Sequence, residues 1–288
     1  MASTTLSFRI APPLYDLHGA SFTLSSVAGV DDVGLRVNLV DSGVGIIGRT
    51  MTSGGGSVTM RRDNSGVLHN TRLDVTLPGP LDEWMGLLRG TPITLAQVAN
   101  RLIDWYRLVA GRPFVRRIPL SSISGFEARD DNGRVGQSLL GWSPGEASST
   151  AGGANETPVA ELRDRLARRG SLPVWATLYL DARAEYEAGE LRAAVLLANS
   201  SMETFANIAF RSVGEAEEVD AAFAEAPPVP FWQLLKRVNT AVGSDLSNTK
   251  LIRLAGRVHR YRDDVSHGNP VDPDEVEVGR AVEARWSR

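Results

Sequence analysis

Arg262, Asp263 and His267 lie close together in the stretch "RDDVSH" near the end of the chain. Histidine titrates near neutral pH and can act as base or acid, and arginine offers a planar, permanently charged fork that matches phosphate oxygens. Asp263 precedes His267 by four residues, within helical reach, and could hold its tautomer or raise its pKa. Asp264, at three residues, could substitute for Asp263. These residue types at this spacing indicate proton transfer beside a phosphate group.

A helix must position this stretch, because an apolar stripe at three- and four-residue spacing leads into it. The stripe consists of Leu251, Leu254, Val258, Tyr261 and Val265. A basic face runs beside the stripe and consists of Lys250, Arg253, Arg257 and Arg260. The stripe predicts that one side of the helix is buried. The basic face either contacts a polyanion such as RNA or is balanced by acids on a neighbouring helix.

One feature counts against a site within a single chain. Residues five apart on an ideal helix, such as Arg262 and His267, diverge by about 140°. Gly268, Asn269 and Pro270 follow and stop the helix, so we expect His267 to have left it, and we also expect two chains to face each other and share the site. The alternative is a helix-end pair that neutralises the helix dipole and ties down the next loop.

The pattern of apolar and polar residues changes along the chain from strand-like to helical, which predicts an α+β protein with two domains. Short runs that alternate apolar and polar residues fill the first part, together with a few helical patterns, and predict a β-rich domain over residues 1–142. Residues 143–157 are small, polar and rich in glycine, which predicts a flexible linker. Helical patterns dominate residues 158–288, which predict an all-α bundle.

The motif and its context resemble the HEPN (higher eukaryotes and prokaryotes nucleotide-binding) superfamily. Arg262, Asp263 and His267 match its signature, and "LDARAEYEAGELRAAVLLANSSMETFANIAF" is similar to the first two helices of its bundle. The resemblance covers roughly Leu172 to Gly268. It implies a helical bundle, a homodimer formed through the motif helices and, in many members, metal-independent cleavage of RNA. Members commonly serve in antiviral defence and toxin–antitoxin systems, which would add an antitoxin or trigger protein as a partner, while other members have lost catalysis.

The expected function is therefore that of a metal-independent endoribonuclease with Arg262, His267 and Asp263 as catalytic residues. Glu203 is a candidate supporting residue, since family members often carry an acid in that helix, although a surface role suits it equally. His259 stands one turn before Arg262 and could line the cleft or be only an interface neighbour. The alternative function is a non-catalytic dimerisation module that binds a nucleotide, a nucleic acid or a protein.

Composition sets further limits on the function. The 288 residues carry a formal net charge of −3, so any affinity for nucleic acid must come from a local patch. The chain has no cysteine and therefore no thiolate metal site or disulfide framework. The acidic residues Asp272, Asp274 and Glu275 are better explained as the start of a helix than as metal ligands, so we expect neither metal nor cofactor. Neither a signal peptide nor a membrane span is expected, which favours a cytoplasmic protein.

Overall fold

The chain forms two compact units, Met1–Ser171 and Leu172–Arg288, in the computed structural model. The structure describes residues 2–10, 13–27, 30–41, 49–53, 56–60, 69–82, 91–119, 123, 125–137, 155–168, 170–215, 217, 220–222, 229–242 and 250–269. The first unit combines an antiparallel sheet with helices, and the described part of the second unit is helical. The predicted α+β composition is confirmed at this level.

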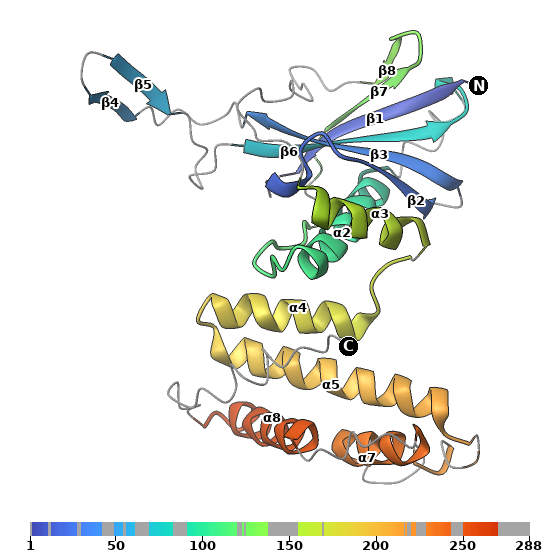
Figure 1. Cartoon of the computed structure of the whole chain (residues 1–288), viewed down its shortest axis with the longest axis vertical. Coiled ribbons are helices and arrows are strands. Elements are labelled where there is room, and N and C mark those ends of the chain that lie inside the picture. The colour runs from blue at the N-terminus through green and yellow to red at the C-terminus, as the bar shows by residue number, and fades with distance from the viewer. Residues whose placement is uncertain are drawn as a thin grey trace. The chain divides into compact units, whose positions relative to one another are not determined.

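A six-stranded antiparallel sheet with the order β2-β3-β6-β1-β7-β8 forms the centre of the first unit (Figure 1). Its strands are β1 (Ser3–Ile10), β2 (Ser21–Val27), β3 (Val30–Asp41), β6 (His69–Pro78), β7 (Phe126–Asp130) and β8 (Val135–Gln137). The strands β4 (Arg49–Ser53) and β5 (Gly56–Met60) pair separately as a hairpin. A short 3₁₀ helix, η1, spans Tyr15–Leu17.

Alternation of apolar and polar residues gives the sheet two different faces. Along β1 the side chains of Leu6, Phe8 and Ile10 are buried, whereas the residues between them are only half-buried. Successive side chains of a strand point to opposite faces, so one face of the sheet is apolar and the other polar. The helices α2 (Thr91–Val109) and α3 (Glu156–Arg168) lie together on one side of the sheet (Figure 1).

The helix α3 packs on the first unit, so the boundary between the units lies later than the sequence predicts. Arg101 of α2 donates a 3.0 Å hydrogen bond to the carbonyl oxygen of Leu166, and Trp105 Nε1 donates one of 3.0 Å to the carbonyl oxygen of Gly170. These bonds hold α3 against α2. The first unit therefore extends to Ser171, and the second begins at Leu172. Residues 143–154 of the predicted linker lie outside the described part of the chain, and its last two residues, Glu156 and Thr157, already belong to α3.

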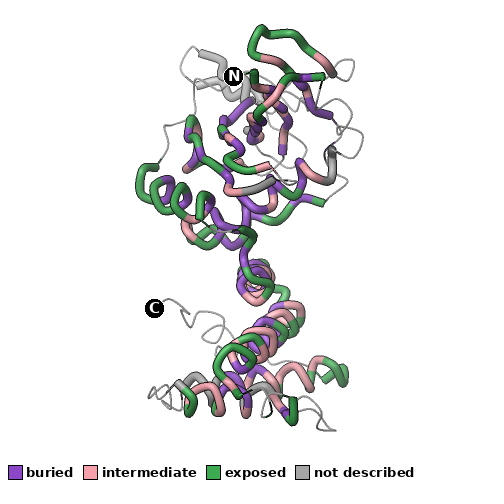
Figure 2. Tube along the Cα trace, turned by 90° about the vertical axis from the view of Figure 1, so that its right-hand side faces the viewer, coloured by how far each residue is buried: buried purple, intermediate pink, exposed green. Residues whose placement is uncertain are grey.

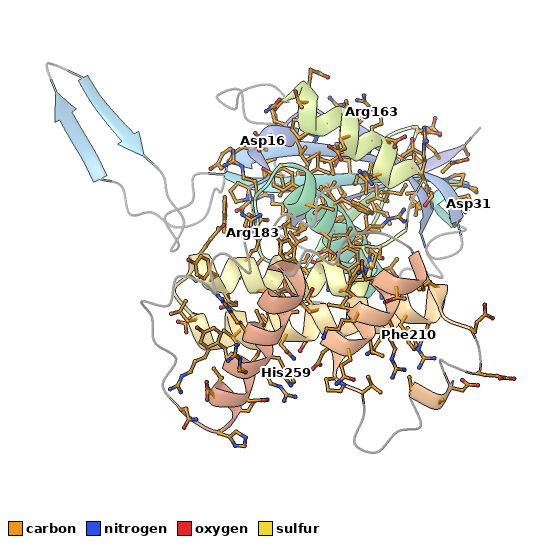
Figure 3. All side chains as sticks on the ribbon, turned by 60° about the horizontal axis from the view of Figure 1, so that its bottom comes forward. Asp16, Asp31, Arg163, Arg183, Phe210 and His259 are labelled. Atoms are coloured by element: carbon orange, nitrogen blue, oxygen red, sulfur yellow. The ribbon has the colours of Figure 1, made fainter. Side chains whose placement is uncertain are left out.

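The second unit is a bundle whose described helices are α4 (Val174–Glu187), α5 (Leu191–Val213), α7 (Phe231–Val242) and α8 (Lys250–Ser266). The turn between α4 and α5 contains Gly189, whose φ of +80° is readily adopted only by glycine. Phe210 of α5 lies in the core with Leu234 of α7 and Val258 of α8 (Figure 3). Buried and exposed residues alternate along these helices, as expected when each contributes one apolar side to a shared core (Figure 2).

Candidate functional site

The helix α8 ends in the geometry that glycine favours, and this places His267 at its boundary. The Gly268 amide donates to the carbonyl oxygen of Val265 at 3.1 Å, and the Asn269 amide donates to that of Asp264 at 2.8 Å. With φ of +75° at Gly268, these two bonds form a Schellman motif. Ser266 is the last helical residue and His267 is the C-cap, with its own amide still bonded to the carbonyl oxygen of Asp263 at 2.9 Å. The imidazole of His267 is exposed.

Arg262, Asp263 and His259 form one cluster of charged groups on the last two turns of α8. Arg262 Nη1 donates a hydrogen bond of 2.9 Å to Asp263 Oδ1, and the other carboxylate oxygen lies 3.8 Å from His259 Nε2. The side chains of Arg262 and Asp263 are 41% and 45% exposed, so solvent reaches both partners. The structure therefore pairs Asp263 with Arg262 and His259, whereas the sequence predicts that it orients His267.

The hydrogen bond from Arg262 lowers the pKa of the Asp263 carboxyl below its ordinary value and outweighs the opposing effect of burial. The charges of His259, Arg262 and His267 act in the same direction as that bond, and His267 contributes least. Asp263 is thus held as a carboxylate at neutral pH. Its negative charge stands beside the guanidinium that the sequence assigns to phosphate binding.

Asp264, the predicted substitute for Asp263, takes part in the helix end. Asn269 Nδ2 donates a 3.2 Å hydrogen bond to Asp264 Oδ1, and the Asp264 side chain is exposed. This bond reinforces the turn that follows His267. The role that the contacts support for Asp264 is therefore structural.

The predicted basic face lies partly within the described side chains. Arg260 is exposed and Arg257 is half-buried on α8. The helix includes Lys250 and Arg253, but their side chains lie outside the described part of the structure. The apolar stripe behaves as predicted where it is described, because Val258 is fully buried and Tyr261 and Val265 pack against the core.

Glu203, the candidate supporting acid, is half-buried on α5, and α5 packs against α8. Among the described residues, no hydrogen bond or ion pair joins Glu203 to the end of α8. His259 is closer to the site, since its imidazole reaches Asp263 and its side chain is 28% exposed (Figure 3). The cluster at the end of α8 therefore includes His259 and leaves Glu203 outside it.

Comparison with protein-family models, curated proteins and solved structures found no match. Within the described ranges, no group of three or more His, Asp or Glu residues could hold a metal ion. The acidic residues after Pro270 lie outside those ranges. No helix in the described part of the chain is both long and apolar enough to cross a membrane.

The first unit contains polar sites that the sequence does not predict. Asp104 of α2 is buried and forms an ion pair with Arg117. A surface pocket of about 210 Å³ lies beside Asp16, which accepts a 2.7 Å hydrogen bond from the Tyr106 hydroxyl and lies 3.5 Å from Arg112. Asp16 is far in the sequence from Tyr106 and Arg112, and Arg117 lies beyond the end of α2, so helical or strand periodicity carries no signal for these partners.

Proposed function

We propose that the second unit is a metal-independent endoribonuclease of the HEPN type that acts as a homodimer through α8. The proposal is supported by one observation above all. Arg262 and His267, the two residues suited to phosphate binding and proton transfer, both reach solvent at the end of α8, and neither is sequestered in the core. The resemblance to HEPN proteins adds the expectation of a role in antiviral defence or a toxin–antitoxin system, with an antitoxin or trigger protein as a possible class of partner.

The chemistry requires that a proton leave the 2′-hydroxyl, that another reach the departing 5′-oxygen, and that the charge of the transition state be stabilised. His267 is the residue for proton transfer. Arg262 is the residue for the phosphate, because its ion pair with Asp263 uses Nη1 alone and leaves other donors of the guanidinium to bind phosphate oxygens. Asp263 acts through Arg262 as a positioning residue.

A shared site follows from the helix geometry. Arg262 lies within α8 and His267 at its C-cap, so the two side chains leave the helix axis in different directions, about 140° apart in an ideal helix. The α8 end of a second chain would supply the missing group on the other side of an RNA strand. Arg257 and Arg260 would then contact the phosphates that flank the cleaved bond.

A second candidate is a dimerisation module that binds RNA, a nucleotide or a protein without cleaving. The ion pair between Arg262 and Asp263 favours it, because a carboxylate beside the guanidinium offsets the positive charge that would stabilise the transition state of cleavage. Binding without turnover would then be the whole activity of the α8 end.

The experiment that separates the two functions is cleavage of a mixed RNA by the full chain in the presence of a chelator. We expect products that end in a 2′,3′-cyclic phosphate, at a rate that the chelator leaves unchanged. Sedimentation at micromolar concentration should show a dimer. A folded chain that binds RNA and leaves it intact would establish the second candidate, and loss of activity in chelator would overturn the metal-independent mechanism.

A further inference from the structure

The surface pocket beside Asp16 lies within the first unit, where η1, the end of α2 and the start of α3 meet. Its volume of about 210 Å³ is below the roughly 300–1,000 Å³ of sites that hold drug-sized ligands, so it suits a smaller molecule. Val109, Ala110 and Pro158 form its apolar part. The remaining lining side chains are polar or charged, and their bonding shows which ligand they can take.

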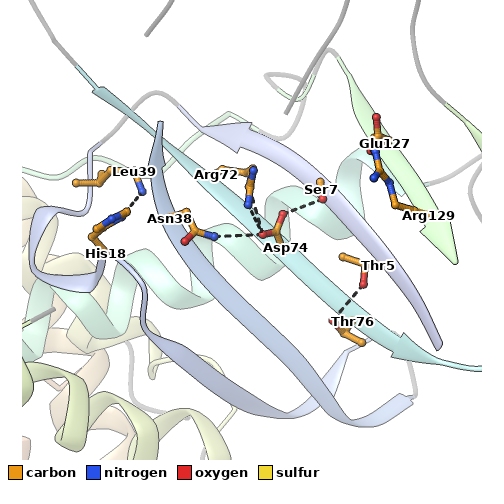
Figure 4. A network of polar contacts seen from close by, with 10 residues as sticks. All are labelled: Thr5, Ser7, His18, Asn38, Leu39, Arg72, Asp74, Thr76, Glu127 and Arg129. Carbon is orange, nitrogen blue, oxygen red and sulfur yellow. Dashed lines mark hydrogen bonds and ion pairs between the residues drawn. The ribbon is translucent and has the colours of Figure 1, made fainter. Parts of the chain in front are cut away.

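The short segment that carries Asp16 is anchored to the sheet on both sides. Before η1, the Leu14 amide donates a 2.9 Å hydrogen bond to the hydroxyl of Thr71 in β6. After η1, the amide of Leu39 in β3 donates one of 2.9 Å to Nδ1 of His18 (Figure 4). The wall of the pocket is therefore fixed before a ligand arrives, which lowers the entropic cost of binding.

Two carboxylates in the pocket each keep one oxygen for a ligand. The buried Tyr106 donates its hydroxyl hydrogen to Oδ2 of Asp16 at 2.7 Å, and Arg112 Nε lies 3.5 Å from the same oxygen. Arg165 Nη2 binds Oε1 of Glu161 at 3.1 Å. Among the described residues, no donor binds Oδ1 of Asp16 or Oε2 of Glu161. These two oxygens can accept hydrogen bonds from a cationic group.

Donors line the same pocket. Arg112 is 49% exposed, and its two terminal nitrogens make no ion pair or hydrogen bond with a described residue. Asn155 accepts the Thr157 amide on its Oδ1 at 3.3 Å, which leaves Nδ2 as a donor. The Asn155 amide donates to the carbonyl oxygen of Asp16 at 2.9 Å and so holds Asn155 beside the carboxylate. Together with the positive end of the α3 dipole, these donors suit an anionic group.

The pocket thus combines groups for both signs of charge. Two carboxylates and one guanidinium line it, and Arg165 offsets one of the carboxylates from outside the lining. A ligand of a single charge would leave the groups of the other kind without a partner, whereas a zwitterion engages both. An α-amino acid carries an ammonium and a carboxylate on one carbon. A short aliphatic side chain would pack against the apolar part of the pocket.

We propose that this pocket binds a free α-amino acid with a short aliphatic side chain. The ammonium group is bound by the carboxylates of Asp16 and Glu161. The carboxylate of the ligand is bound by Arg112 and Asn155. This site belongs to the first unit alone, so it does not depend on the RNA cleavage proposed for the second unit.

Isothermal titration calorimetry of the full chain with three matched probes tests the proposal. L-Valine carries both charged groups, L-valinamide lacks the carboxylate, and isovalerate lacks the ammonium. We expect saturable binding of L-valine with a Kd on the order of 0.1 mM, and binding of each other probe weaker by about tenfold or more, since each loses one set of charge-assisted hydrogen bonds. Absence of saturable L-valine binding, or equal affinity for the three probes, would overturn the proposal.

Substitutions assign the two halves of the site. Arg112→Gln should weaken binding of L-valine by about tenfold and leave that of L-valinamide unchanged, because only L-valine has a carboxylate to lose its partner. Arg163→Gln, on the exposed side of α3, is the charge-matched control and should bind L-valine as the wild type does (Figure 3). Equal effects of Arg112→Gln on the two probes would contradict the assigned orientation of the ligand.

Asp16→Asn should weaken binding of L-valine and L-valinamide alike, by about tenfold, because both carry the ammonium group. Asparagine keeps an oxygen that can accept from Tyr106, so the fold of the pocket should survive. The comparison of the three probes uses the unmodified chain and therefore stands even if this variant is less stable. Unchanged binding of L-valinamide by a folded Asp16→Asn chain would remove Asp16 from the site and overturn the proposal.

Discussion

Arg262 Nη1 donates a 2.9 Å hydrogen bond to Oδ1 of Asp263, its immediate neighbour on α8. Adjacent residues on a helix do not face each other, so both side chains must turn toward a common edge of the helix to meet. The pair is exposed to solvent, and such pairs contribute at most about 1 kcal/mol to stability. Loss of this pair should therefore have little effect on folding.

Replacing the two motif residues should separate chemistry from structure. We expect His267→Ala and Arg262→Ala each to lower RNA cleavage by about 10²-fold or more, through loss of proton transfer or of charge stabilisation. Arg262→Lys should recover little, because a point charge does not replace a bidentate fork. The melting temperature and the dimer should be unchanged. Arg192→Ala on the exposed side of α5 is the control, and a motif variant as active as this control would refute the assigned roles.

Acid should weaken the interaction of Asp263 with Arg262 in a defined pH range. Because the pKa of Asp263 is lowered in the folded chain, its contribution to stability is present above the ordinary value of 3.8 and is lost as pH falls through the lowered value. The difference in melting temperature between the wild type and Asp263→Asn should shrink as pH falls from about 5 to below about 4. A difference that grows with acidity would show that the ion pair does not form in solution.

Two glycines of the same segment should respond to alanine with opposite signs. Gly268 has φ of +75°, so Gly268→Ala should destabilise the second unit by about 1 kcal/mol and loosen the turn that fixes His267. Gly256 lies within α8 with open space around its Cα, so Gly256→Ala should stabilise by up to about 1 kcal/mol. Denaturant unfolding measures both. Equal effects of the two substitutions would contradict the Schellman geometry.

Alkaline pH should destabilise the first unit through Tyr106. Burial raises the pKa of Tyr106, and the hydrogen bond to Asp16 raises it further. A raised folded pKa means that the stabilisation is complete below the ordinary value of 10.0 and is lost as pH rises above it. We expect Tyr106→Phe to cost about 1–2 kcal/mol at neutral pH and to flatten the decline above pH 10. Tyr15→Phe, at a residue that is 50% exposed, is the control, and parallel curves for both variants would count against this assignment.

The spacing of apolar residues predicted individual strands and helices, because this spacing depends only on which side of each element is buried. The alternation in "LSFRI" corresponds to β1, and the helical spacing in "NTKLIRLAGRVHRYRDDV" corresponds to α8. The prediction that His267 has left the helix agrees with its place at the C-cap. This could be predicted because Gly268, the residue whose conformation ends the helix, follows His267 directly in the sequence.

Partners that come from distant segments could not be predicted in this way. The apolar residues Val159, Leu162 and Leu166 of α3 predict a helix with one buried side but do not say which unit covers it. Hydrogen bonds from Arg101 and Trp105 decide that choice, and they depend on the tertiary fold. The pairing of Asp263 with its neighbour Arg262 likewise depends on side-chain rotamers, which residue spacing does not determine.

The position of β1 within the sheet affects when the first unit can fold during synthesis. Although β1 precedes the other strands of this sheet in the chain, it lies between β6 and β7, with Leu6 opposite both Val75 and Ala128. A nascent chain therefore cannot complete the sheet until residue 137 has left the ribosome, and β1 lacks β7, one of the two strands that flank it, until residue 130 has been made. Pairings over such distances along the chain are slow to form and leave strand edges open to other chains. The first unit should accordingly be the slower of the two to fold and the one that depends more on chaperones during synthesis.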